Sequence, residues 1–452
     1  MAGNFPQGFE EATFRKIAWR LIPFLFLCYI VAFLDRVNVG FAKLQMAGDL
    51  HYSDAVYGFG AGIFFIGYFI FEVPSNVILE KVGARIWIAR IMVTWGLISS
   101  AFMFTGDIHW GGIAAAFGYT DAEFTFYVLR FLLGAAEAGF FPGIILYLTY
   151  WFPGGRRAKV VALFMSAIGV ANVLGSPVSG AIMQYMDGAN GWRGWQWLFL
   201  LEGIPSVIIG LLVLAILPDG PKSSKWLTSE ERDLVDTRIR EDVADRSAHT
   251  GRHSLGDAFK DGRVWALSVV YFCGAVAFYA VNFWMPTIIQ EFGIDKKELF
   301  KVGLLTMIPW SATIVAMIWW GAHSDRTGER RWHCASGFLL MFVGLTMLAI
   351  WPHAAAMAMV ALTMVTVGWG MYVTTFWSLP TAFLTGTAAA AGIALINSVG
   401  NLGGYFGPDM IGRIRTATGG ASEAAFFTLA GIALLGALIV LCVRRPATRP
   451  AT

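Results

Sequence analysis

Residues 17–41 read IAWRLIPFLFLCYIVAFLDRVNVGF, an apolar run whose last part contains Asp35, Arg36 and Asn38. About 20 apolar residues cross the hydrocarbon core of a bilayer, so this run predicts a transmembrane helix. A charged side chain inside such a helix costs roughly 2.5–3.5 kcal/mol on insertion scales and normally pairs or faces a watery cavity. Asp35 and Asn38 share one helical face, whereas Arg36 lies about 100° further round. The two charges can therefore do different jobs, which is a first indication of a transporter.

The whole chain has the composition of a polytopic membrane protein. It contains 452 residues, of which 57% are hydrophobic and 14% are charged, whereas a soluble domain averages roughly 25% charge. We expect an all-α membrane protein with twelve transmembrane helices in two pseudo-symmetric six-helix bundles. Windows of about 20 apolar residues predict these spans, centred on residues 17–41, 54–78, 85–105, 126–151, 158–185, 195–217, 264–290, 300–322, 333–352, 355–380, 388–413 and 422–443.

A charged segment divides the two groups of six spans. We predict an N-terminal bundle over residues 1–217, a cytoplasmic linker with short amphipathic helices over 218–263, and a C-terminal bundle over 264–452. In the linker, Thr228 and Glu231 have the spacing of a capping box, which predicts a charged helix that ends near Val243. Ser254 is expected to cap a second short helix. The basic residues of this segment indicate a cytoplasmic position rather than nucleic-acid binding.

The distribution of positive charge predicts the orientation in the membrane. Most of the 33 lysines and arginines fall in segments that lie on one side if both termini do. Because cytoplasmic loops are enriched in these residues, we expect a multi-pass protein of the cell (inner) membrane with both termini in the cytoplasm. The first apolar run ends in Asp-Arg rather than at a small-residue cleavage site, so we expect it to remain as an anchor. The four cysteines are widely separated and predict neither a disulfide framework nor a metal site.

The fourth span carries a second pair of charges. Arg130, Gly134 and Glu137 occupy positions i, i+4 and i+7, which share one helical face. From a rise of about 1.5 Å per residue, Arg130 is expected at the depth of Asp35, with Glu137 nearer the cytoplasm. These carboxylates predict a proton path with two stations. The alternative is that Arg36 and Arg130 form ion pairs with Asp35 and Glu137 that have a structural role only.

A charged turn recurs in both halves of the sequence. After the second span it reads Glu80-Lys81-x-Gly83-x-Arg85, and after the eighth span Asp325-Arg326-x-Gly328-x-Arg330. An acid, a base, a glycine and an arginine return at the same spacing. Such an echo implies parallel halves related by an axis along the membrane normal. We expect both turns to act in conformational gating, as a charge lock that stabilises one orientation of a central cavity.

These motifs together resemble the major facilitator superfamily. Gly321-x3-Asp325-Arg326-x-Gly328-x-Arg330 is similar to its signature loop, whereas the first-half turn departs from it with Asn76, Glu80 and Lys81. Arg130-x3-Gly134 resembles its fourth-helix signature. More narrowly, the motifs around Asp35, Glu72, Arg130 and Trp195 resemble the anion:cation symporter family, including bacterial permeases for tartrate, phthalate and 4-hydroxyphenylacetate.

The resemblance assigns expected roles to individual residues. It implies that Asp35 and Glu137 carry protons, that Arg36 meets the substrate carboxylate, and that Arg130 couples the charged sites and contributes to substrate binding. It also implies a cavity lined by Tyr68, Trp377 and Asn397. Relatives that transport sugar acids have a glutamine in the fifth span where this chain has Ile168, which argues against a polyhydroxylated sugar acid.

The second half offers neutral rather than charged candidates. Spans seven to ten carry aromatic and amide side chains in their membrane cores, most of which we expect to face lipid or the interface. We nevertheless add Tyr279, Tyr372 and Asn401 to the substrate-binding candidates. Our hypothesis is that the N-half handles carboxylate and proton while the C-half reads the rest of the substrate. Glu72, Glu202 and Asp409 are expected to brace helices.

We therefore expect a proton-coupled symporter, not an enzyme, that imports an organic carboxylate by alternating access. An aromatic acid or a small hydroxy or dicarboxylic acid is the preferred substrate class. The expected partners are this anion, protons and the bilayer, with no cofactor, no nucleic acid and a monomeric state. An organic-anion antiporter or exporter of the same fold is the alternative, and a non-transporting membrane sensor is a more distant one.

Overall fold

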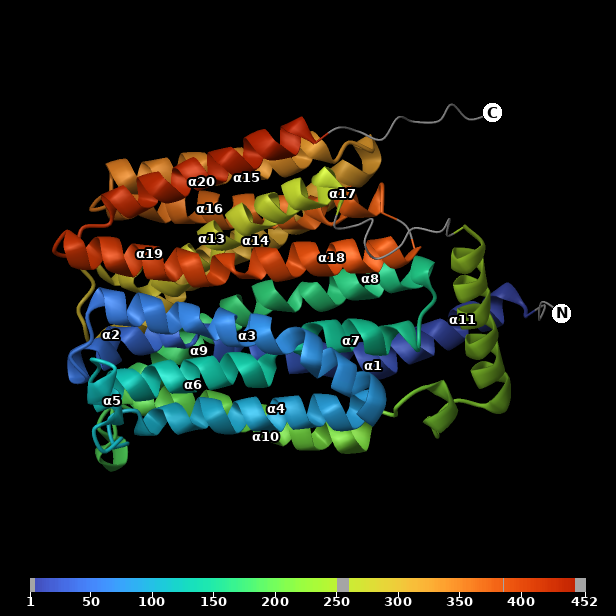
Figure 1. Ribbon diagram of the computed structural model, residues 1–452, viewed down its shortest axis with the longest axis horizontal. Helices are drawn as coiled ribbons and strands as arrows, with labels where there is room; N and C mark the ends of the chain where they lie inside the picture. Colours follow the sequence, from blue (N-terminus) through green and yellow to red (C-terminus); the bar gives the residue numbers. More distant parts are fainter. Residues whose placement is uncertain (1–4, 250–259, 385, 444–452) are drawn as a thin grey trace.

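The computed structural model describes residues 5–249, 260–384 and 386–443. All regular elements in these ranges are helices, and the long ones run side by side along one axis (Figure 1). The expected all-α membrane fold is confirmed. Eleven helical segments in the described ranges are long and apolar enough to cross a membrane. They are Gln7–Asp49, Asp54–Val82, Ala84–Phe104, Asp121–Thr149, Leu163–Tyr185, Gly194–Ile216, Gly262–Gln290, Leu299–Thr327, Arg331–Ile350, Ala355–Thr381 and Glu423–Cys442.

The predicted span at 388–413 is built from two shorter helices. α18 (Gly386–Asn401) and α19 (Gly403–Ala417) meet at Leu402 and follow one another in line (Figure 1). Their 16 and 15 residues are each too few for a crossing of the usual length. The count of twelve is therefore approximate and depends on counting this pair as one crossing.

Two functional spans are also interrupted. α1 (Gln7–Val37) gives way to α2 (Val39–Asp49) at Asn38. α6 (Asp121–Glu137) gives way to α7 (Phe140–Thr149) around Gly139, which has a φ of 86°. The sequence did not predict these breaks, and the predicted first span, 17–41, is too short at both ends. Hydropathy windows register the apolar stretch and miss the polar turns that extend a helix beyond the hydrocarbon core.

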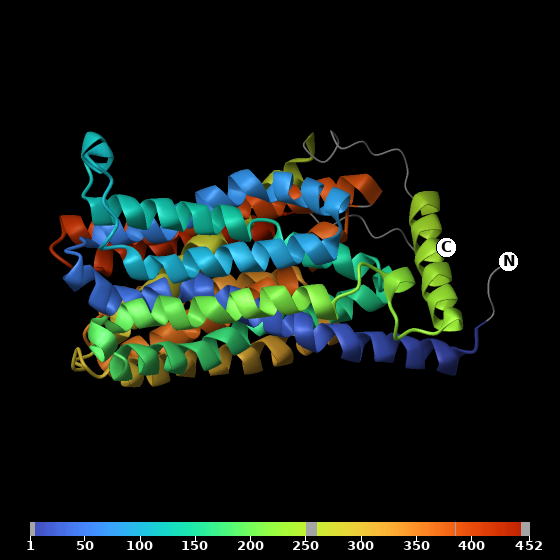
Figure 2. The same ribbon diagram turned by 90° about the horizontal axis from the view of Figure 1, so that it is seen from below.

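The helices of the first half lie beside those of the second. In Figure 1 the first half, α1 to α10 (Gly194–Ile216), occupies the lower part. The second half, α13 (Gly262–Gln290) to α20 (Glu423–Cys442), occupies the upper part. Between them in sequence, α11 (Ser229–His249) lies crosswise at one end of the bundle (Figure 2). We call this end the α11 end and the opposite end the far end. The domain limits at 217 and 263 stay a prediction.

The remaining helices of the described ranges complete the two halves. In the first half they are α3 (Asp54–Val82), α4 (Ala84–Ala101), α5 (Ile113–Ala116), α8 (Gly154–Met165) and α9 (Ala167–Tyr185). In the second half they are α14 (Leu299–Thr327), α15 (Arg331–Ile350), α16 (Ala355–Phe376) and α17 (Ser378–Thr381).

The linker helix α11 is fastened to the first half. The predicted capping box is confirmed, because the Glu231 amide donates to the Thr228 hydroxyl over 3.2 Å and the Thr228 amide donates to the Glu231 carboxylate over 2.8 Å. Lys16 and Glu231 form an ion pair of 2.8 Å, and Trp226 stacks on Trp151 with ring centroids 5.6 Å apart. The helix reaches His249 rather than Val243. The second linker helix predicted at Ser254 lies outside the described residues.

The two halves are in contact at the far end. A Cβ atom on Gly58 of α3 would lie 2.5 Å from the carbonyl oxygen of Pro408 of α19, so only glycine fits there. Asp54 at the start of α3 forms ion pairs of 2.8 Å with both Lys43 and Arg415. Arg415 also pairs with Glu291 at 2.6 Å. These contacts join α2 and α3 to α13 and α19 and close the far end.

Candidate functional site

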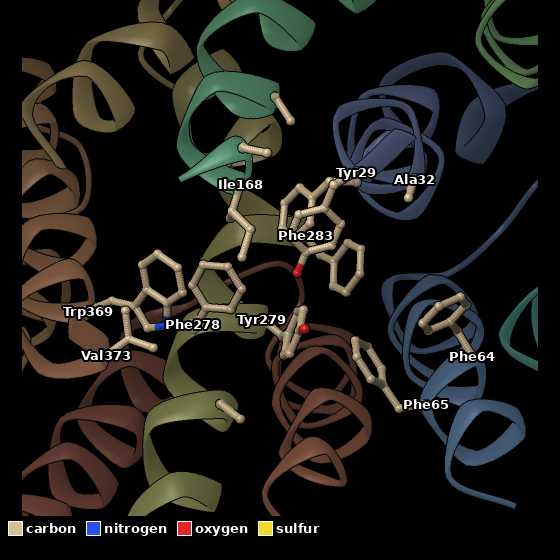
Figure 3. Close-up of a cluster of buried hydrophobic side chains, with 14 of the residues drawn as sticks. Tyr29, Ala32, Phe64, Phe65, Ile168, Phe278, Tyr279, Phe283, Trp369 and Val373 are labelled. Atoms are coloured by element: carbon tan, nitrogen blue, oxygen red, sulfur yellow. The ribbon is translucent and has the colours of Figure 1, made fainter. Parts of the chain in front are cut away.

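A central cavity lies between the two halves. It holds about 740 Å³ of space free of protein atoms, part of it open to solvent. Figure 3 shows its walls: Tyr29 and Ile168 come from the first half, and Phe278, Tyr279 and Trp369 from the second. The predicted candidates Arg36, Tyr68, Tyr279, Tyr372, Asn397 and Asn401 all line this cavity. The cavity is therefore aromatic on most sides, and its polar groups include Arg36, two asparagines and the hydroxyls of five tyrosines.

Arg36 is the charged side chain among the cavity-lining residues. Its guanidinium donates a short hydrogen bond to the Glu137 carboxylate on α6. It also donates to the hydroxyl of Tyr279 on α13 over 3.3 Å, across the boundary between the halves. The charge lies 5.3 and 5.4 Å from the ring centroids of Phe64 and Tyr68. Arg36 thus contacts a carboxylate, an aromatic wall and the second half at once.

Asp35 faces away from the cavity and forms no ion pair within the described residues. It accepts hydrogen bonds from Ser99 at 2.6 Å, Ser206 at 2.5 Å and the Trp95 indole at 3.1 Å. These donors lie on α4 and α10, and Asp35 is only 1% exposed. The alternative in which Asp35 pairs structurally with an arginine is wrong for this conformation. Its predicted proton-carrying role stays a prediction.

Arg130 also lies outside the cavity wall. Its guanidinium donates to the backbone carbonyls of Gly60 and Ala61 on α3 over 3.2 and 3.0 Å. Its charge lies 5.1 Å from the Phe64 ring centroid, and the side chain is fully buried. Depth along the helix suggested proximity to Asp35, but rotation about the helix axis turns Arg130 toward α3. In this arrangement it fastens α6 to α3, and its predicted role in substrate contact has no support from the geometry.

The remaining substrate candidate, Trp377, lies behind the wall. Its ring packs on Tyr271, which lines the cavity, with centroids 5.0 Å apart. Other wall residues were not predicted as site residues: Tyr29, Phe33, Phe65, Phe141, Met165, Phe278 and Trp369. The expectation that most aromatic residues of the second half face lipid is wrong for Tyr279, Trp284, Trp310, Trp369 and Tyr372, which are all buried.

Glu72 connects the cavity wall to the other half. Its two carboxylate oxygens accept hydrogen bonds from Asn397 at 3.1 Å and Ser398 at 3.4 Å, both on α18. The expected bracing role fits this contact. Asp409 also behaves as a brace, because it pairs with Arg413 one turn later at 2.7 Å.

The two gating turns are not joined to one another by any described ion pair. Arg85 pairs with Asp219 at 3.6 Å inside the first half, and Arg330 pairs with Asp325 at 2.7 Å inside the second. Glu80, Lys81, Asp325, Arg326 and Gly328 are exposed. Glycine is required at both turns for a local reason, because Gly83 and Gly328 adopt positive φ values of 96° and 65°.

The sequence matches a known transporter family over most of its length. The profile of the Major Facilitator Superfamily matches residues 25–408. A protein of Agrobacterium vitis named "Putative tartrate transporter" is 48% identical over 443 residues, which cover 98% of this chain and 94% of that protein. The "Quinolone resistance transporter" of Acinetobacter baumannii is 39% identical, over 96% of this chain and 95% of that protein.

The fold agrees with these sequence matches. The crystal structure of a D-xylose-proton symporter superposes with a TM-score of 0.73, covering 96% of this chain and 99% of that one, at 16% identity. At that identity the likeness shows the fold alone. The expectation of a carrier rather than an enzyme is confirmed by the family, and this chain is a member of the Major Facilitator Superfamily of membrane transporters.

Proposed function

We propose that the protein is a proton-coupled symporter that imports an organic carboxylate. The observation that carries the proposal is the Arg36–Glu137 ion pair, whose arginine lines the cavity. An arginine matches a carboxylate through paired hydrogen bonds, and such charge-assisted bonds are among the strongest in proteins. A cation that faces a ligand-sized cavity is a natural receptor for an anion.

The ion pair also supplies a coupling step. When Glu137 is ionised, it occupies Arg36 and competes with the substrate. When Glu137 takes a proton, Arg36 loses its charged partner, and a substrate carboxylate replaces it. Tyr279, Asn397 and Asn401 are placed to hydrogen-bond other polar groups of the substrate. Anion and proton then bind together, which is the requirement for symport.

The walls of the cavity support a restricted substrate class. The first-half and second-half aromatics suit an aromatic acid, and the relative named for tartrate supports a small hydroxy acid. Ile168 in the wall offers no hydrogen bond, which disfavours a polyhydroxylated sugar acid.

Alternating access fits the contacts at the two ends. The far end is held closed by the Asp54–Arg415 network, while the gating turns are not latched together. We place the α11 end in the cytoplasm of a cell (inner) membrane protein that works as a monomer, so this conformation faces inward. Latching of the gating turns would accompany opening of the far end.

Purified protein in liposomes tests this function. Tartrate or 4-hydroxyphenylacetate is added outside liposomes that contain a pH-sensitive dye. Symport predicts that the external medium becomes alkaline, that the lumen becomes acidic, and that an inward proton gradient drives uphill accumulation. The Asp35→Asn, Glu137→Gln double variant should bind anion but not accumulate it. Uphill accumulation by that variant contradicts the proposal.

An exporter that exchanges an organic anion for protons is the second candidate. The relative named as a quinolone resistance transporter supports it. In the same liposomes an antiporter acidifies the external medium on addition of substrate, so the sign of the pH change separates the two functions.

A further inference from the structure

A second polar cluster lies on the far-end side of Asp35, around Glu202. This glutamate on α10 is 5% exposed, and one of its oxygens accepts a hydrogen bond from Ser179 of α9 at 2.6 Å. Its other oxygen, Oε2, is buried without a hydrogen-bond partner in the described part of the chain. Glu202 takes part in none of the ion pairs found there. Asp409 also leaves one buried oxygen without a partner, but it braces its helix through the ion pair with Arg413. Glu202 has no such pair among the described residues, so bracing alone does not account for this carboxyl group.

The cluster is continuous with Asp35. Ser206 lies one turn after Glu202 on α10, and its hydroxyl donates to Asp35. Asn38 lies one turn after Asp35, at the break between α1 and α2, and its side chain neighbours Glu202. Both polar side-chain atoms of Asn38 are buried and lack a hydrogen bond of normal geometry to any described residue. Glu202 and Asp35 thus lie about one helical turn apart along the bundle, with Ser206 and Asn38 between them.

The cluster also reaches a second cavity at the seam between the halves. This narrow cavity has about 310 Å³ of space free of protein atoms, part of it open to solvent, and Ser179, the hydrogen-bond partner of Glu202, lines it. Asn282 of α13 lines it from the second half, with its amide nitrogen buried and unpartnered among described residues. The other polar lining groups are Asn172, Ser176 and Thr306. The cavity lies farther toward the far end than Asp35 does.

Such a set of unpaired groups is expensive for a membrane protein. A buried polar group without a partner costs about 1–3 kcal/mol, and no bulk water is available in the hydrocarbon core to relieve the cost. Buried water bonds to polar groups of this kind, typically with about three hydrogen bonds each. Ionisable groups within a membrane commonly mark proton relays. The chemistry of the cluster therefore fits bound water and a mobile proton.

We propose that Glu202 is a proton-relay residue that connects the far end to Asp35, with water as the ligand of the second cavity. The inference rests on the proposed proton coupling. Oε2 of Glu202 takes a proton from a water molecule in the cavity, and that water regains a proton from the solution at the far end. The Ser206 hydroxyl gives its proton to the Asp35 carboxylate and regains one from Glu202 through a water molecule. One O–H bond forms on Asp35 as one breaks on Glu202, so the step is balanced.

The surroundings of Glu202 suit a relay. Asp35 on α1 is the ionisable side chain that acts on it among the described residues. The other side chains that act on it, Asn38 and Ser179, are neutral. With no cation paired to it in the described part of the chain, Glu202 is able to gain and lose a proton.

Two transport modes in liposomes separate a relay from a structural brace. The probe is tartrate, the variant is Glu202→Gln, and Asp409→Asn is the matched control that neutralises a buried carboxyl group elsewhere. Accumulation driven by a pH difference needs net proton movement, whereas counterflow exchange does not. We expect Glu202→Gln to lose at least tenfold in pH-driven accumulation and to keep counterflow within about twofold. Glu202→Asp should recover part of the loss, and Asp409→Asn should resemble the unmodified protein in both modes.

Equal loss of both modes in Glu202→Gln, or loss of neither, overturns the relay. A readout without substrate separates failure of the relay from failure of the proposed symport. Infrared difference spectra of the full chain, recorded between acidic and alkaline buffer, should contain a carboxyl C=O band that disappears in Glu202→Gln. A spectrum unchanged by the substitution overturns the relay even if tartrate is not a substrate. A lost band without pH-driven uptake of either tartrate or 4-hydroxyphenylacetate by the unmodified protein overturns the symport proposal instead.

Discussion

Replacement of Glu137 by glutamine is the most direct test of the central ion pair. The variant keeps the shape of the side chain and removes the charge that occupies Arg36. The side chains of Arg36 and Glu137 are only 11% and 3% exposed, so solvent weakens their attraction little. A hydrogen bond to a charged group contributes about 1.5–3 kcal/mol. An anion that no longer displaces this partner should bind roughly 10- to 150-fold more tightly, at about 1.4 kcal/mol per factor of ten.

The pH dependence of anion binding should differ between the unmodified protein and Glu137→Gln. In the unmodified protein a lower pH should strengthen anion binding, because protonation of Glu137 frees Arg36. In Glu137→Gln the affinity should be high and nearly independent of pH. Asp35→Asn is the matched control: Asp35 does not line the cavity, so its variant should retain the pH dependence of binding but lose uphill transport.

Isothermal titration of tartrate or 4-hydroxyphenylacetate into purified protein over a range of pH measures both quantities. Unaltered affinity and an unaltered pH slope in Glu137→Gln would refute the proposed exchange of partners at Arg36.

Three further changes test other parts of the structure. Gly58→Leu should hold the far end open, since even a Cβ atom would lie 2.5 Å from the Pro408 carbonyl oxygen; spin labels on α2 and α19 should move apart, and an unchanged distance is the contrary result. Ile168→Gln adds a hydrogen-bonding group to the cavity wall and should shift competition toward sugar acids by about tenfold, from roughly 1 kcal/mol per hydrogen bond; an unchanged competition profile counts against it. Although burial raises the pKa of Glu231, the hydrogen bonds from Lys16 and Thr228 and the Lys16 charge together outweigh it and hold the pKa below the ordinary value. The resulting stabilisation is present above the ordinary glutamate pKa and disappears as the pH falls through the lowered one, so Glu231→Gln should cost at most about 1 kcal/mol near neutral pH and nothing in strong acid. Thermal melts that differ equally at both pH values would contradict this.

Much of the fold could be predicted because a helix that crosses a bilayer needs a long run of apolar residues. Apolar runs of sufficient length are easily recognised, and a charge inside one is conspicuous. Arg36 and Glu137 were found in this way, and the structure places them in contact. The linker helix was equally accessible, since its capping box is a local motif of four residues.

The pairing of the charges could not be predicted because it depends on helix rotation. Depth along the chain put Asp35 level with Arg130, yet one faces α4 and α10 while the other faces α3. The break around Gly139 adds to this uncertainty, because its left-handed backbone interrupts the helix between Glu137 and Phe140. Most of the aromatic wall, in both halves, escaped prediction for another reason: a neutral aromatic side chain produces no anomaly in an apolar run.

The fastening of α11 to the first half makes that helix a natural lever. Its 21 residues extend about 30 Å across the end of the bundle at 1.5 Å per residue. Because the Lys16–Glu231 pair and the Trp151–Trp226 stack hold it to the first half, we expect it to tilt together with that half. A small rocking angle therefore becomes a displacement of several ångströms at its tip. A fluorophore attached to the tip of α11 would report each transport cycle from the aqueous side of the α11 end, at a distance from the cavity.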